Sequence, residues 1–93
     1  MTERVAQTTQ RWTIVVANGE GDTAEVTLNQ HAHLHQLLRD GLKALYGTPT
    51  PNPDDYDLLI DGMVQTDLGL TLAEAGLRDD AEVVILPKDV SRG

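Results

Sequence analysis

Three closely spaced histidines are the first residues of this sequence that could bind a metal ion. His31, His33 and His35 alternate along the chain, and on a helix His31 and His35 would lie one turn apart. No third ligand follows at a spacing that local structure would bring close, and a helix beginning at His33 would separate the pair. We therefore expect solvated residues near the start of a helix, and no metal site.

The second candidate set consists of four aspartates that lie close together in the sequence: Asp54, Asp55, Asp57 and Asp61. They lack the glycine-punctuated pattern of a calcium loop. The sequence also offers no set of nucleophile, base and orienting group, and Ser91 on an untethered tail would have no general base. We expect a solvated acidic rim, no catalytic residue and no cofactor, so that the chain is not an enzyme.

Length and charge narrow the classes of function. Ninety-three residues with 40% apolar content suffice for one small domain. Seven basic residues against fifteen acidic ones give a formal charge of −8, which disfavours binding to nucleic acid or to an anionic membrane. No segment has the apolar length of a membrane helix or the pattern of a signal peptide, and there is no cysteine. We expect a cytoplasmic domain.

The first third of the sequence predicts a flexible polar arm and a β-hairpin. Residues 1–11 form the arm, and the β-branched residues in 12–17 indicate a strand. Residues 18–22 carry the Asn and Gly that a hairpin turn needs, and residues 23–28 alternate apolar and polar side chains. This alternation indicates a sheet that is covered on one face only.

A helix is predicted next, from the period of five leucines that form one apolar stripe: Leu34, Leu37, Leu38, Leu42 and Leu45. Gly47 is well placed to end this helix. Gly41 lies inside it, where glycine costs about 1 kcal/mol relative to alanine, so we expect a close contact there. The proline-rich residues 48–53 then predict a stiff loop.

The second half predicts short strands around one capped turn. Residues 57–60 read as a strand, Asp61 and Gly62 as a tight turn into residues 63–64, and residues 82–86 as the last strand. Thr71 and Glu74 form a capping box, and Leu77 is the expected apolar anchor after it. The order predicts an α+β domain over residues 12–87, with a mixed four- to five-stranded sheet and one long helix packed across one face.

In this order of elements the sequence resembles ubiquitin and its relatives, which have the β-grasp fold. Residues 12–30 match without a gap, residues 57–62 match the family's apolar strand and turn, and residues 71–74 match its capped turn. Residues 77–86 match the segment that leads into the final strand, and one insertion lies near residues 68–69. The order over the whole sequence, rather than any one motif, carries the resemblance.

The resemblance implies a protein modifier, similar to the stand-alone ubiquitin-like modifiers of bacteria. In that family an ATP-dependent activating enzyme adenylates a terminal glycine carboxylate, which passes to a cysteine as a thioester and then to a target amine. Gly93 would take this role on a flexible tail, residues 88–93, which extends at most about 20 Å. The implied partners are the activating enzyme, a conjugating enzyme, a deconjugating peptidase and the target proteins.

Two positions in the tail depart from the family pattern. Arg92 stands where the family has the first glycine of its Gly-Gly ending, and Lys88 stands where ubiquitin has an arginine that its activating enzyme reads. We expect Lys88 and Arg92 to be recognised by a dedicated enzyme. The alternative is that a peptidase has removed residues beyond Gly93.

The strand alternation that buries Ile60 and Ile85 predicts three outward-facing aliphatic side chains: Leu59, Val84 and Leu86. Such a patch suits a protein partner, and the alternative is packing under the tail or the arm. In ubiquitin the corresponding patch has a third apolar member on the first hairpin, where this sequence has Gly19.

Three functions remain open from the sequence. The first is a conjugated modifier, for which Lys43 and Lys88, the only lysines, and the N-terminal amine would be the acceptors in chains. The second is a non-covalent interaction module. The third is a sulfur carrier with a terminal thiocarboxylate, although such carriers usually keep the Gly-Gly ending that Arg92 breaks.

Overall fold

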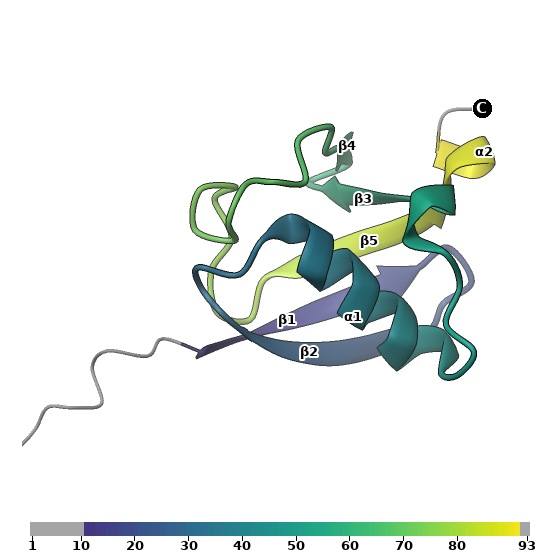
Figure 1. Ribbon diagram of the computed structural model, residues 1–93, viewed down its shortest axis with the longest axis horizontal. Coiled ribbons are helices and arrows are strands. Elements are labelled where there is room, and N and C mark those ends of the chain that lie inside the picture. The colour runs from purple at the N-terminus through teal and green to yellow at the C-terminus, as the bar shows by residue number, and fades with distance from the viewer. Residues whose placement is uncertain (1–10, 92–93) are drawn as a thin grey trace, which may run out of the picture.

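The first two strands form the predicted hairpin. The computed structural model describes residues 11–91, and in it β1 (Arg11–Asn18) pairs antiparallel with β2 (Thr23–Asn29) (Figure 1). Asn18 organises the turn, because its side-chain Oδ1 accepts hydrogen bonds from the backbone N–H groups of Glu20 (2.9 Å) and Asp22 (3.0 Å). Gly21 adopts φ = 90°, which a residue with a side chain rarely does.

The leucine stripe forms one face of helix α1 (Leu34–Tyr46), which has 13 residues. Four of the five leucines are buried and Leu45 is partly buried. Gly47 ends the helix with φ = 76°, and its N–H donates to the Lys43 carbonyl oxygen. The predicted helix end is therefore confirmed.

Gly41 lies where the backbone of α1 packs tightly against side chains of the sheet. A Cβ built there would be 2.7 Å from Ile85 Cδ1 and 3.3 Å from Val16 Cγ1. Ile85 and Val16 are both fully buried. The expectation that a close contact accounts for this glycine is confirmed.

The second half supplies three more strands. A 3-10 turn, η2 (Pro53–Asp55), leads into β3 (Tyr56–Ile60), which pairs antiparallel with β4 (Met63–Val64). Asp61 and Gly62 make the connecting turn with φ values of 53° and 81°. The last strand, β5 (Glu82–Pro87), runs parallel to β1 and antiparallel to β3.

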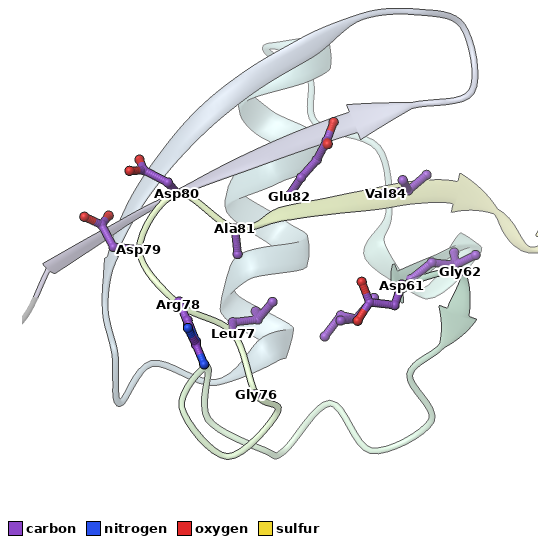
Figure 2. Close-up of a pocket in the computed structure, with 12 residues that line it drawn as sticks. Asp61, Gly62, Gly76, Leu77, Arg78, Asp79, Asp80, Ala81, Glu82 and Val84 are labelled. Atoms are coloured by element: carbon purple, nitrogen blue, oxygen red, sulfur yellow. The ribbon is translucent and has the colours of Figure 1, made fainter.

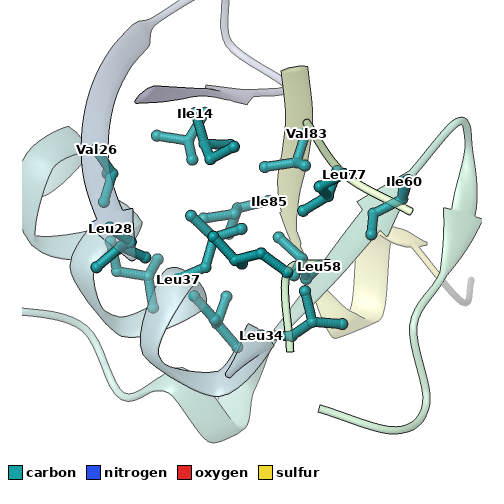
Figure 3. Packing of buried hydrophobic residues seen from close by; sticks show 14 residues of the cluster. Ile14, Val26, Leu28, Leu34, Leu37, Leu58, Ile60, Leu77, Val83 and Ile85 are labelled. Atoms are coloured by element: carbon teal, nitrogen blue, oxygen red, sulfur yellow. The ribbon is translucent and has the colours of Figure 1, made fainter. Parts of the chain in front are cut away.

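These pairings give a five-stranded mixed sheet in the order β2-β1-β5-β3-β4, with α1 packed across one face (Figure 1). The core lies between α1 and the sheet (Figure 3). Its buried residues are Ile14, Val16, Val26, Leu28, Leu34, Leu37, Leu38, Leu42, Leu58, Ile60, Leu72, Leu77, Val83 and Ile85. The expected α+β class and mixed sheet are confirmed, and β5 occupies the centre because it pairs with both β1 and β3.

The loop between β4 and β5 contains the predicted capping box. The Thr71 N–H donates to Glu74 Oε1 (2.9 Å), and the Glu74 N–H donates to Thr71 Oγ1 (3.1 Å). The hydrogen bond from the Thr71 N–H, and after it the interaction with the Thr71 side-chain hydroxyl, hold the pKa of the Glu74 carboxyl below its usual value. Leu72 and Leu77 are buried, so Leu77 is the expected anchor.

The segment after β5 differs from the expected flexible tail. Residues 88–91 form a short helix, α2 (Lys88–Ser91), so the one long helix expected for the domain is accompanied by a second helical element. The physical reason is a tertiary contact, since the Ser91 hydroxyl donates to Asp57 Oδ2 on β3 (2.5 Å). Arg11, placed in the arm by the sequence, begins β1, while the rest of the arm and the last two tail residues lie outside the described residues.

Candidate interaction surface

The sheet face opposite α1 carries the three aliphatic residues expected to face outward. Leu59 lies directly across from Val84 in the β3–β5 pairing, and both are half-buried, whereas their neighbours Leu58 and Val83 are fully buried. Strand geometry thus places Leu59 and Val84 side by side on the outer face. They form an adjacent, partly exposed aliphatic pair.

Leu86 is the third of these residues, and its surroundings differ from those of the other two. It is half-buried, and a Cβ built at Gly19 would be 3.0 Å from its Cδ2. The first hairpin therefore packs its backbone against Leu86. A larger residue at position 19 would have to displace the Leu86 side chain.

A groove of about 590 Å³ lies beside Leu59 and Val84 (Figure 2). One wall is the turn at Asp61 and Gly62, and the other is the loop of residues 76–82. Leu59 on β3 and Val84 on β5 supply aliphatic lining. Sequence reasoning found this apolar lining but missed the second wall, because nothing local in residues 76–82 indicates which strands they approach.

The 76–82 wall is fixed to β1 by hydrogen bonds at both of its aspartates. Asp79 Oδ1 accepts from the Thr13 N–H (2.8 Å), and the Asp80 N–H donates to the Thr13 carbonyl oxygen (2.7 Å). The Val15 N–H donates to the Ala81 carbonyl oxygen (2.9 Å). These contacts give the groove a preformed wall.

The expected acidic rim near residues 54–61 is partly wrong. Asp54, Asp55 and Asp61 are exposed, but Asp57 is only 3% exposed and accepts the hydrogen bond from Ser91. Asp57 lies on the outer face of β3, opposite Leu86, where α2 packs against β3 and β5. The view of Ser91 as untethered is wrong for the same reason, since no sequence spacing links residues 57 and 91.

The remaining candidate residues are dispersed. Lys43 is exposed on α1, and Lys88 begins α2, where it is half-buried. Arg92 and Gly93 lie outside the described residues. The structure therefore gives the two possible acceptor lysines different exposure and places them on different elements.

The histidines occupy the start of α1 without pairing. The helix begins at Leu34, so His31 precedes it and does not share a helical face with His35. His33 Nδ1 lies 2.7 Å from the Gly69 carbonyl oxygen, which fixes its ring to the β4–β5 loop. Among residues 11–91, no three His, Asp or Glu side chains cluster as a metal site requires.

Comparison of the sequence with models of protein families and with curated proteins found no match. Over residues 11–91, no helix combines the length and the apolar character needed to cross a membrane.

Proposed function

We propose that this chain is a protein modifier with a ubiquitin-like β-grasp fold, attached to target proteins through Gly93. The observation that carries the proposal is the order and pairing of the elements. A hairpin, a helix laid across the sheet, and a last strand in the sheet centre parallel to the first strand agree with the architecture that the sequence resemblance implies. Because fold alone does not fix function, the chemistry at Gly93 needs its own test.

The proposed reaction is catalysed by other enzymes, and this chain is their substrate. The Gly93 carboxylate attacks the α-phosphorus of ATP, pyrophosphate leaves, and an acyl adenylate forms. A cysteine thiolate of the activating enzyme then displaces AMP to give a thioester, which passes to a conjugating enzyme. The amine of a target protein finally displaces the thiolate and forms an amide, which a deconjugating peptidase can hydrolyse. The modifier itself supplies no catalytic group, and it contains no cysteine.

Helix α2 shortens the segment that follows Pro87. Its four residues rise about 6 Å as a helix and span about 14 Å when extended, so unwinding lengthens this segment by about 8 Å. An enzyme with a narrow channel for the tail would therefore bind the form in which α2 is unwound. An isolated four-residue helix is not stable in water, so α2 depends on its contacts with the sheet.

The hydrogen bond from Ser91 to the Asp57 carboxylate sets the scale of this cost. A hydrogen bond to a charged group stabilises by about 1.5–3 kcal/mol. If that bond dominates, the released form makes up roughly 1–10% of the molecules, enough for an enzyme to select.

The test is an activation assay. The chain is incubated with ATP, Mg²⁺ and an activating enzyme from the same organism, and intact-mass spectrometry detects adenylate, thioester or thiocarboxylate. We expect adenylate and thioester, and neither after deletion of Gly93. A thiocarboxylate would identify a sulfur carrier instead, and a mature chain that continues past Gly93 would contradict the proposal.

A non-covalent interaction module is the second candidate, favoured by the surface of Leu59 and Val84 beside the groove. In that case the Gly93 deletion leaves partner binding intact and activation is never observed. The Gly93 deletion therefore distinguishes a conjugated modifier from a non-covalent interaction module.

A further inference from the structure

The groove beside Leu59 and Val84 combines an apolar lining with an acidic rim. Its lining includes four carboxylates, at Asp61, Asp79, Asp80 and Glu82, and one cationic side chain, Arg78. All five of these side chains belong to exposed residues. The local charge is therefore −3, within a chain whose formal charge is −8.

Acidic residues come from both walls of the groove, and the side chains of Asp79 and Asp80 point away from Val84 (Figure 2). Asp61 belongs to the turn between β3 and β4, Glu82 begins β5, and Asp80 lies in the opposite wall (Figure 2). Asp79 Oδ1 accepts a hydrogen bond from the Thr13 N–H, which fixes the orientation of this side chain. A partner that covers Leu59 and Val84 must bring its own flanking residues close to Asp61 and Glu82, which lie two residues from Leu59 and Val84 along the chain.

We propose that the groove binds a basic segment of a partner protein, with apolar residues of the segment on Leu59 and Val84 and Lys or Arg residues against Asp61 and Glu82. Burial of the aliphatic pair supplies the non-polar part of the binding. Charge complementarity selects the partner, because acidic flanks would meet carboxylates of the same sign.

The shape of the groove also favours a protein segment over a small molecule. The exposed rim leaves the groove open to solvent, and only a few apolar side chains line it. Small-molecule sites are predominantly apolar and bury most of their ligand. A segment lying across the groove can instead make contacts with both walls. This inference concerns recognition alone and does not depend on chemistry at Gly93.

The experiment is an NMR titration of the full ¹⁵N-labelled chain with three synthetic twelve-residue peptides. The first places leucines on one helical face and lysines elsewhere, the second has glutamate in place of every lysine, and the third has alanine in place of every leucine. We expect the Lys–Leu peptide to shift the amide signals of Leu59, Gly62 and Val84. The Glu–Leu peptide should cause no shift, and the Lys–Ala peptide should bind several-fold more weakly.

Charge-reversal variants locate the interaction. Glu82→Lys should weaken binding of the Lys–Leu peptide by about three- to tenfold, the effect of losing one exposed attraction and adding one repulsion. Glu20→Lys, which makes the same change in net charge on the exposed first hairpin, is the matched control and should change the affinity less than twofold. Both variants should keep the dispersed amide spectrum of the folded chain.

The proposal is overturned if the Lys–Leu peptide does not bind, if its shifts map outside the groove, or if the Glu–Leu peptide binds as tightly. Equal weakening by Glu20→Lys and Glu82→Lys would also overturn it, because attraction to the net charge would then account for binding. Failure of Gly93 activation, by contrast, would leave these results unchanged.

Discussion

Gly41→Ala is expected to destabilise the chain even though alanine is the better helix former. Alanine favours the helix by about 1 kcal/mol relative to glycine. The new methyl group would lie 2.7 Å from Ile85 Cδ1 in a fully buried site, and overpacking of this kind costs about 1–3 kcal/mol. The expected net loss in the free energy of unfolding is about 1 kcal/mol, or a midpoint temperature about 4–8 °C lower.

Ile85→Val removes the one atom with which the new methyl group collides. Alone it should cost about 0.5–1.5 kcal/mol. In the double variant the alanine methyl takes the space of the lost Cδ1, so we expect stability within about 0.5 kcal/mol of the parent chain. Because additive effects would predict a loss of about 2 kcal/mol, the coupling between the two sites should be about 2 kcal/mol and no less than about 1.5 kcal/mol.

Urea denaturation of the four chains, followed by far-UV circular dichroism, measures this coupling. Ala44→Gly, at an exposed position of the same helix, calibrates the helix propensity and should cost about 1 kcal/mol. The reasoning is refuted if Gly41→Ala gains the full propensity, or if the double variant equals the sum of the single ones within about 0.5 kcal/mol.

Three further predictions concern the surface, the tail and the capping box. Leu59→Asp should weaken binding of the Lys–Leu peptide several-fold with an unchanged circular dichroism spectrum, and an unfolded variant would instead place Leu59 in the core. Ser91→Ala should raise the rate of Gly93 adenylation several-fold and increase hydrogen exchange in α2, because it removes the hydrogen bond to Asp57. If exchange in α2 increases but adenylation is slower or unchanged, the enzyme does not require α2 to unwind. The pKa of Glu74 in the folded chain lies below its ordinary 4.5, so its carboxylate stabilises the fold above pH 4.5 and loses this effect as the pH falls through the folded pKa. Glu74→Gln should therefore reduce the loss of stability that acid causes below pH 4.5. An unchanged dependence of stability on pH in acid titrations would refute this role.

Local sequence signals were sufficient for most of the fold. The leucine stripe, the turn at Asp61 and Gly62, and the capping box each depend on residues within a few positions of one another, and each lies where it was expected. The contact at Gly41 was also anticipated, because a glycine inside an amphipathic helix needs a packing reason. The sequence did not indicate which atoms it meets.

The features that sequence reasoning missed depend on distant residues. Helix α2 has four residues, too few to show a period, and its partner Asp57 lies 34 positions earlier. The wall of the groove likewise depends on the pairing of residues 79–81 with β1. Hydrophobic spacing indicates which face of an element is buried, but it does not indicate which loop closes over the opposite face.

The most direct test of the central claim is the linkage in conjugates isolated from cells that make this chain. Trypsin cleaves after Arg92, so a target joined through Gly93 should yield peptides in which a single glycyl residue is attached to an amine. We predict this remnant on target lysines, and its loss when Gly93 is deleted. Conjugates that are linked through another residue would contradict the account. So would the absence of any conjugate from cells whose activating enzyme is functional.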